Sequence, residues 1–374
     1  MMRFNQVLSK IMKRICTHVS SHTRARREMS RAIQKGTPLA RLTSAVRHYL
    51  QRHPVVRAAL LLLGGCSAAA LTLHLLLRVW RRSRSALRLR SRCVFITGAG
   101  MGLGAGLAHA SAERGAAALL LCDINPAALA ATKTSLLAAA AQRGAALAVH
   151  TFTCDVSSDA EVGAMAARIA DDDAIPPIDV LINNAGIVVG RPLLSLSAAD
   201  ATRTLHVNCL SNFIVLRHLL PSLVERNAGY VVTIASLMGV VSAAQLSDYC
   251  ASKAAQIAMH NSLRLEMRRA APKLSLLLVN PWCIETGMFK GVATGASLRV
   301  RLGMLVAPML RPRDVVRRTL DAVETGETLL VMPRVMRWLP NFVGLLPPEL
   351  GDTLKDWMGG IDSMDTFVGR EEKI

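Results

Sequence analysis

The feature that most constrains the fold is a regular alternation of short apolar runs and helical stretches between residues 93 and 332. Short apolar runs bounded by turn residues indicate buried strands, and longer amphipathic stretches indicate helices. This alternation predicts one α/β domain, a Rossmann-type doubly wound parallel sheet with helices on both faces. The expected strands are 93–96, 117–122, 147–154, 178–182, 230–235, 274–279 and 328–332. The expected helices are 105–114, 126–142, 159–170, 199–225, one through 249 and 253 to about 271, and 312–324.

A glycine-rich turn joins the first expected strand to the first expected helix. Glycines at such a turn let the backbone approach a pyrophosphate, and the N-terminus of the helix favours an anionic group. A glycine turn alone is weak evidence, but its place between a strand and a helix strengthens the prediction of a dinucleotide site. The turn contains Thr97, Gly98, Gly102, Leu103 and Gly104.

Asp123 ends the second expected strand, nineteen residues after Gly104. Its carboxylate can accept hydrogen bonds from the adenosine ribose of NAD, and it would repel the 2′-phosphate of NADP. No arginine or lysine follows it closely. The sequence therefore favours NAD(H) over NADP(H).

Tyr249 and Lys253 lie four residues apart on an expected helix, so their side chains share a face. Ser236 follows the apolar run 230–235. A phenol beside an ammonium group, with a hydroxyl at a neighbouring strand end, can move a proton on or off an alcohol. The pattern is weak alone, since Tyr249 could be an ordinary half-buried helix residue and Lys253 a solvated one. Its agreement with the other strand-end motifs favours a catalytic site.

The net charge of +19 is concentrated at the N-terminus. Residues 1–57 carry 13 Lys and Arg with one acid, residues 78–92 carry 7 Arg with none, and the remainder has 25 of each sign. The main domain is therefore neutral, and we expect no nucleic-acid partner. The cysteines are scattered without C-x-x-C, which favours a reducing compartment. The histidines show no metal spacing, so no metal site is expected.

Residues 58–77 form an apolar run of twenty residues without a formal charge. At about 1.5 Å per residue, a helix of this length spans a bilayer, so we predict a transmembrane anchor. The alternative, a buried core helix, would show a polar face. The seven arginines after the run, against three in the fifteen residues before it, place the downstream domain in the cytosol.

The expected organisation starts with a basic N-terminal extension, which is read as a basic tail or juxtamembrane arm. A mitochondrial transit segment is the alternative, and it would make the chain a soluble matrix enzyme whose first 92 residues are a targeting segment. The expected parts are the extension (1–57), the anchor (58–77), an Arg-rich linker (78–92), the NAD-binding domain (93–333) and a C-terminal extension of that domain (334–374).

Together these residues resemble the short-chain dehydrogenase/reductase family over about residues 93–333. The glycine turn matches the family's cofactor turn. Further matches in order and spacing are Asp155, Asn183 to Gly186, Asn208, Ser236, Tyr249 and Lys253. The resemblance implies an NAD(P)-dependent alcohol dehydrogenase or ketoreductase acting on CH–OH groups. The implied cofactor-binding residues are Thr97, Gly98, Gly102, Leu103, Gly104, Asp123, Asp155, Asn184, Tyr249, Lys253 and Thr286.

The implied catalytic residues are Tyr249, Lys253, Ser236 and Asn208. A free tyrosine has a pKa near 10, and Lys253 together with the positive charge of oxidised nicotinamide would favour its phenolate. Tyr249 then takes the alcohol proton while hydride leaves carbon, and Ser236 holds the substrate oxygen. By resemblance, Lys253 also binds the nicotinamide ribose, and Asn208 holds a water that relays protons from Lys253.

The C-terminal part resembles the membrane-anchored branch of this family, which includes microsomal retinol dehydrogenases and lipid-droplet hydroxysteroid-dehydrogenase-like proteins. The matching segments are 286–289, 345–347 and 360–370. The branch implies a lipophilic alcohol or carbonyl (retinoid, sterol or long-chain lipid) and an anchor in the endoplasmic reticulum or a lipid droplet, with mitochondria as the alternative. A homodimer is left open.

Three points about the substrate side and the activity are also left open. Trp282 stands where much of the family has glycine, so its indole could line or crowd the nicotinamide site. The apolar stretch 292–346 is either a lid at the membrane surface or core packing. A cofactor-binding membrane or lipid-droplet protein with little or no turnover is the alternative function. The intact catalytic set argues against that alternative, because a scaffold has no physical need for it.

Overall fold

The structure is a computed structural model that describes residues 87–289, 291–292, 308–357, 360–362 and 364–368, together with Thr72. The chain divides into two compact units, Met1–Arg78 and Val79–Ile374, and all described residues except Thr72 belong to the second. The predicted basic extension, the anchor apart from Thr72 and the start of the Arg-rich linker lie outside the described residues.

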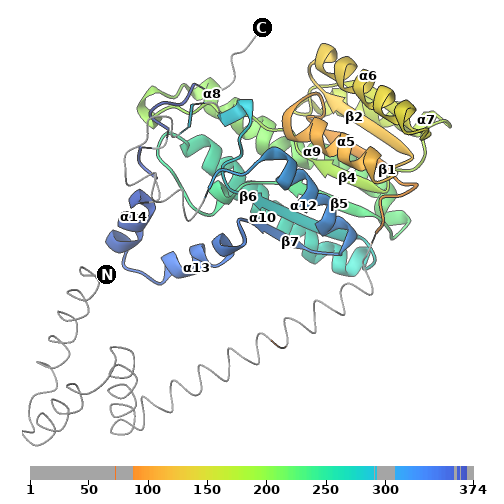
Figure 1. The fold of residues 1–374 in the computed structure, drawn as a ribbon. Coiled ribbons are helices and arrows are strands. Elements are labelled where there is room, and N and C mark those ends of the chain that lie inside the picture. Colours follow the sequence, from red (N-terminus) through yellow and green to blue (C-terminus); the bar gives the residue numbers. More distant parts are fainter. Residues whose placement is uncertain are drawn as a thin grey trace, which may run out of the picture. The chain divides into compact units, whose positions relative to one another are not determined.

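Seven parallel strands form one sheet in the order β3-β2-β1-β4-β5-β6-β7 (Figure 1). The chain winds outward from β1 in one direction and returns at β4 to wind in the other. This doubly wound topology confirms the predicted fold class, and it places a crevice between the carboxyl ends of β1 and β4. The strands are β1 (Cys93–Thr97), β2 (Ala118–Asp123), β3 (Ala148–Thr153), β4 (Val180–Asn183), β5 (Tyr230–Ile234), β6 (Ser275–Pro281) and β7 (Leu329–Met332).

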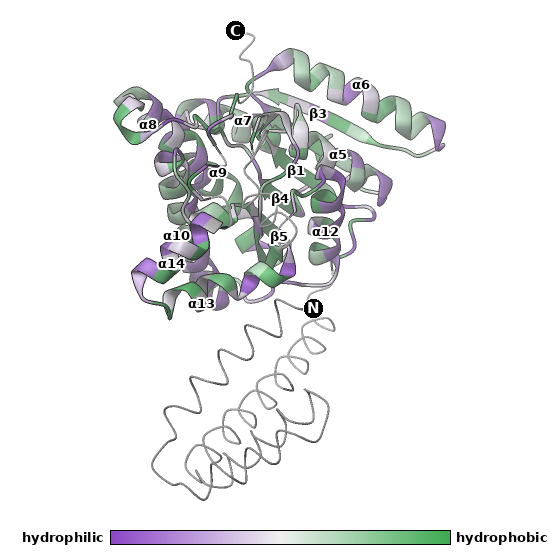
Figure 2. Ribbon diagram, turned by 60° about the vertical axis from the view of Figure 1, so that its left-hand side comes forward, coloured by the Kyte–Doolittle hydropathy of each residue, from purple (hydrophilic) through white to green (hydrophobic). Residues whose placement is uncertain are grey.

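Helices cover both faces of the sheet and form two hydrophobic cores. Within β1, Val94 and Ile96 face the first core while Cys93 and Phe95 face the second, as the two-residue period of a strand requires. Because both faces are covered, the central strands β1, β4 and β5 are buried along their whole length, whereas the edge strand β3 contains polar and exposed residues (Figure 2). The first core includes α5 (Gly102–Glu113), α6 (Pro126–Gln142) and α12 (Pro312–Glu324), and the second includes α7 (Asp159–Asp171), α9 (Ser211–Glu225) and α10 (Ser247–Ala270).

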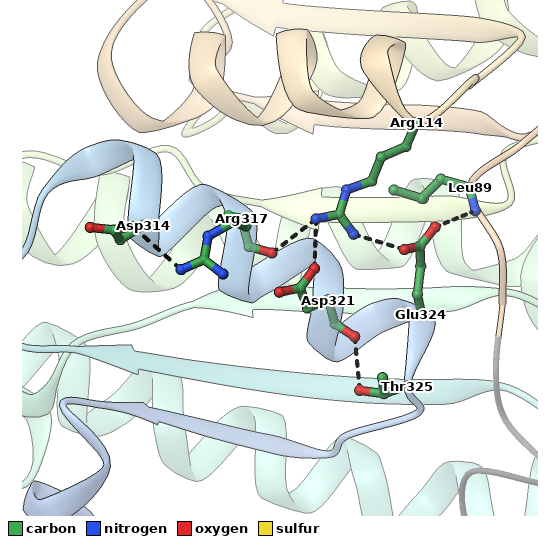
Figure 3. Close-up of polar contacts among 7 residues, drawn as sticks. All are labelled: Leu89, Arg114, Asp314, Arg317, Asp321, Glu324 and Thr325. Atoms are coloured by element: carbon green, nitrogen blue, oxygen red, sulfur yellow. Dashed lines mark hydrogen bonds and ion pairs between the residues drawn. The ribbon is translucent and has the colours of Figure 1, made fainter.

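An ion-pair network fixes α12 beside the end of α5 (Figure 3). The Arg114 guanidinium contacts Asp321 at 2.7 Å and Glu324 at 2.8 Å. Glu324 also accepts a 3.3 Å hydrogen bond from the backbone N–H of Leu89, just before β1. One arginine thus joins α5, α12 and the entry to the sheet, a network rather than an isolated surface pair.

The predicted helix 199–225 is not one regular α-helix. It consists of α8 (Ala198–Leu205), a π-helical turn (His206–Leu210) and α9. In the part of the chain that the structure describes, this is the one helical stretch with the length and apolarity of a membrane span, and 44% of its most apolar window is buried. Its buried apolar residues, including Val215, Leu219 and Leu223, pack in the second core, as in a core helix of a globular domain. Leu205, Leu210 and Phe213 are exposed.

The C-terminal residues continue past β7 as α13 (Leu339–Gly344) and α14 (Pro348–Trp357), on the opposite side of the molecule from α6 (Figures 1 and 2). The chain then returns to the start of α10. Gly360 accepts a 2.8 Å hydrogen bond from the backbone N–H of Ala244, and Met364 is buried against Leu246 and Tyr249. The residues after β7 thereby reach the helix that carries the expected catalytic pair.

Candidate active site

A cavity of about 720 Å³ opens at the carboxyl ends of the strands. It brings together residues from six strand ends and from α5, α8 and α10, and it holds most of the residues that the sequence predicts for the site. Those that line it are Gly98, Gly102, Leu103, Asp123, Asp155, Asn184, Ser236, Tyr249, Lys253 and Thr286.

Three predicted site residues are buried beside the cavity instead of lining it: Thr97, Gly104 and Asn208. The hydroxyl of Thr97 accepts hydrogen bonds from the backbone N–H groups of Asn184 at 2.9 Å and Ala185 at 3.0 Å. It therefore joins the ends of β1 and β4 across the crevice. A Cβ on Gly104 would lie 2.0 Å from the Gly98 carbonyl oxygen, so only glycine lets α5 approach the turn this closely.

The glycine turn has the form of a pyrophosphate cradle. Gly102 begins α5 with a φ of +57°, and a Cβ there would meet no atom within 4 Å, so the backbone faces open space. The Asp123 carboxylate accepts hydrogen bonds from the backbone N–H of Gly100 at 2.8 Å and of Asn125 at 3.0 Å. These bonds hold the carboxylate at the rim of the cavity. The turn and Asp123 therefore fit the pyrophosphate and ribose of a dinucleotide.

Tyr249 lies in the first turn of α10 and is 4% exposed. Burial raises its pKa above the usual value, and a side-chain hydrogen bond with Ser236 opposes that rise. Its ring contacts Phe289 edge-on, with 6.0 Å between ring centroids and 84° between planes. The structure thus shows a raised pKa with Lys253 in place, and the lowering expected from Lys253 and an oxidised nicotinamide stays a prediction.

Lys253 is buried, 4% exposed, which excludes the alternative of a solvated helix residue. Its Nζ donates hydrogen bonds to the Ile234 carbonyl oxygen at 3.2 Å and to Oε1 of Gln256 at 2.9 Å. Burial lowers its pKa to about 8. The ammonium lies 5.7 Å from the centroid of the Tyr249 ring. The predicted pair therefore shares one face of α10, as its spacing requires.

Asn208 occupies the π-helical turn, the kind of local distortion often found at functional sites. Its Oδ1 accepts a 2.7 Å hydrogen bond from the backbone N–H of Ile187, and its Nδ2 donates to the Ile187 carbonyl at 2.9 Å and to Oγ of Ser252 at 3.0 Å. Asn208 thus ties the loop after β4 to α10. Its role in holding a relay water stays a prediction.

The cavity wall beside Tyr249 is largely apolar, and only Trp282 in it was anticipated from the sequence. The indole of Trp282 lines the cavity and packs on a small cluster with Leu237 and Met336. Thr202 and Arg203 of α8 and His206 of the π-helical turn also line the cavity, and no local sequence signal marks them. The apolar wall residues are Ile187, Val207, Trp282, Ile284, Met288 and Phe289.

This chain belongs to the short-chain dehydrogenase family. The family model described as short chain dehydrogenase matches residues 92–296, more than half of the chain. The match begins at the entry to β1 and includes the glycine turn, Ser236, Tyr249 and Lys253.

Its relatives include several retinol dehydrogenases. The chain is 33% identical over 226 residues to retinol dehydrogenase 10-B of Danio rerio, covering 60% of this chain and 65% of that protein. It is 32% identical over 228 residues to retinol dehydrogenase 10 of Homo sapiens, covering 61% and 65%. It is 31% identical over 281 residues to epidermal retinol dehydrogenase 2 of Mus musculus, covering 75% and 86%. The match thus spans slightly less than two thirds of the first two relatives.

Solved structures share the fold. A short-chain dehydrogenase/reductase from Burkholderia phymatum in complex with NAD has a TM-score of 0.58 and 26% identity, covering 69% of this chain and 94% of its own. A short-chain dehydrogenase from Burkholderia cenocepacia in complex with NADP has a TM-score of 0.56 and 24% identity, covering 72% and 99%. Both cofactors therefore occur on this fold.

Proposed function

We propose that the protein is an oxidoreductase that transfers a hydride between NAD(H) and a lipophilic alcohol or carbonyl compound. The observation that carries the proposal is the convergence of Ser236, Tyr249 and Lys253 on one cavity beside the glycine turn. The family's model and its retinol dehydrogenase relatives support the same class of reaction.

The chemistry follows from the three side chains. A bound oxidised nicotinamide would supply the acceptor for the hydride that leaves the alcohol carbon. Tyr249 takes the hydroxyl proton in oxidation and returns a proton to the forming alkoxide in reduction. Ser236 holds the substrate oxygen near Tyr249, and Lys253 places a positive charge close to the phenol. The buried site strengthens these electrostatic interactions.

NAD is the cofactor that Asp123 favours. Its carboxylate lies at the cavity rim, where two backbone N–H groups hold it in place. In this position it can accept hydrogen bonds from the ribose hydroxyls, while a 2′-phosphate would meet a like charge.

The substrate class is lipophilic: a retinoid, a sterol or a long-chain lipid. The apolar wall beside Tyr249 supports this class, because a lipophilic substrate can bury its carbon skeleton there. Thr202, Arg203 and His206 line the same cavity and can meet its polar groups. The names of the relatives point to retinoids in particular.

A membrane anchor at residues 58–77 would bring the domain to such substrates. We place the catalytic domain in the cytosol, at the endoplasmic reticulum or a lipid droplet, with the mitochondrial matrix as the alternative. A mature N-terminus near residue 90, found by mass spectrometry, would favour import and cleavage. Protection of the domain from protease in intact microsomes would overturn the cytosolic placement.

The proposed activity is tested by screening the full-length protein with NAD and with NADP against a panel of retinoids, sterols and long-chain alcohols. With NAD and at least one lipophilic alcohol, the absorbance at 340 nm should rise as reduced cofactor forms. Absence of turnover with every substrate, in oxidation and in reduction of the matching carbonyls, would contradict the proposal.

A further inference from the structure

A buried hydrogen-bonded chain leads from Lys253 to two residues that do not line the cavity, Gln256 and Asn212. Gln256 accepts from Nζ of Lys253 at 2.9 Å, and its own Nε2 donates to Oδ1 of Asn212 at 3.1 Å. Nδ2 of Asn212 donates in turn to the carbonyl oxygen of Asn208 at 2.9 Å. Gln256 and Asn212 are 0% and 2% exposed, so these bonds do not compete with bulk water.

The direction of this chain is fixed at both ends. An ammonium group can only donate, and a backbone carbonyl can only accept. The two amide side chains between them can therefore satisfy their partners in one orientation alone, with Oε1 of Gln256 facing Lys253. This orientation follows from the chemistry of the end groups and does not depend on how the amide atoms are assigned.

The ammonium of Lys253 has three N–H donors. The Ile234 carbonyl and Gln256 take two of them. Because Lys253 also lines the cavity, the third donor is left for the side where cofactor and substrate would bind. A buried charge is costly unless it is hydrogen-bonded, so the Gln256 oxygen favours the charged form of the lysine.

Two titratable groups face this ammonium among the described residues. The Tyr249 ring lies 5.7 Å from Nζ, and the Cys209 thiol lies on the π-helical turn. Burial raises the pKa of both groups, so both are neutral near neutral pH. Cys209 raises the pKa of Lys253 and the Tyr249 ring attracts the ammonium, so both favour its charged form. Gln256 differs from them because its oxygen accepts a direct hydrogen bond from the ammonium.

We propose that Gln256 is a positioning residue, which keeps Lys253 charged and directs its remaining N–H toward the cavity. The proposal rests on the proposed function for its catalytic consequence, but its effect on Lys253 can be measured without turnover.

The test measures the pKa of Lys253 by acetylating the full-length protein with acetic anhydride across a pH series and quantifying its peptide by mass spectrometry. Gln256→Leu should lower the midpoint by about one pH unit, because it removes a hydrogen bond to a charged group. Gln256→Glu should raise it, because a carboxylate favours the ammonium. Thr319→Val, a buried substitution in α12 away from the cavity, should leave it unchanged.

Turnover supplies a second readout. Gln256→Leu should lower kcat/KM by roughly 10- to 100-fold and move the acidic limb of the pH profile to higher pH. An unchanged Lys253 midpoint in both Gln256 variants would overturn the proposal. If Gln256→Leu does not fold, the Lys253 midpoints of the wild type and of Gln256→Glu are compared, and equal midpoints overturn the proposal. If the wild type shows no turnover, the proposed function fails, while the labelling still decides the role of Gln256.

Discussion

The hydroxyl of Thr204 donates a 2.7 Å hydrogen bond to Oδ2 of Asp248, the residue directly before Tyr249. Thr204 lies on α8, which forms one wall of the cavity, and Asp248 lies in the first turn of α10. Both residues are buried, and the other carboxylate oxygen has no hydrogen-bond partner among the described residues. This bond therefore links the cavity wall to the start of α10, which carries Tyr249 and Lys253.

Thr204→Val should lower the free energy of unfolding by about 1–3 kcal/mol, because it leaves a buried carboxyl group without its partner. Thr204→Ser keeps the hydroxyl and serves as the matched control. Denaturant unfolding of the three proteins measures the difference. Equal stability of the Val and Ser variants would show that the bond does not support the fold.

Asp123→Ser should raise the preference for NADP relative to NAD by about 10- to 100-fold, because it removes a like charge from beside the 2′-phosphate. The ratio of kcat/KM for the two cofactors measures it. Asp155→Asn is the control, since Asp155 lines the same cavity but bonds Ser157 at 2.7 Å. In Asp155→Asn, the affinities for NAD and NADP should change by the same factor. If the ratio of kcat/KM for NADP and NAD is the same in Asp123→Ser as in the wild type, Asp123 does not determine the cofactor preference.

His260 should make stability depend on pH. Its Nδ1 lies 2.8 Å from the hydroxyl of Thr233, and burial lowers its pKa to about 4 from an ordinary 6.5. Between pH 6.5 and pH 4, His260 binds a proton in the unfolded chain but not in the folded protein. The free energy of unfolding therefore falls as the pH falls from 6.5 to 4. Above pH 6.5 the full stability is retained.

The loss attributable to His260 is about 3 kcal/mol across that window. Urea unfolding at several pH values, on wild type and on His260→Gln, isolates it from other titrating groups. The variant should show a shallower decline on acidification. Parallel curves for the two proteins would mean that His260 titrates normally in the fold.

Much of the site could be predicted because its residues lie directly after strands. In a parallel sheet all carboxyl ends meet at one edge, so Asp123, Asn184 and Ser236 had to converge once the alternation was recognised. The proximity of Tyr249 and Lys253 could be predicted in the same way, because helical periodicity places side chains four residues apart on one face.

Other parts of the site carry no local signal. Gln256 lies in an Ala-rich helix, where a single glutamine is indistinguishable from a solvated one until the tertiary contact with Lys253 is known. The π-helical turn carries Asn208, whose hydrogen bonds with Ile187 join residues twenty-one positions apart in the chain. The return of Met364 to Tyr249 involves a still longer separation. Residues 293–307, in the stretch predicted to be a lid or core, lie outside the described residues, whereas α12 and β7 of the same stretch are core.

Tyr249 is proposed to transfer the proton in an NAD-linked reaction. The most direct test of this role is the turnover of Tyr249→Phe with NAD and a lipophilic alcohol that the wild type oxidises, alongside NAD binding and circular dichroism. Phenylalanine keeps the ring and its contact with Phe289 but has no hydroxyl. We predict a loss of activity of roughly 100- to 10,000-fold with fold and NAD binding intact. Undiminished turnover in this variant would contradict the account.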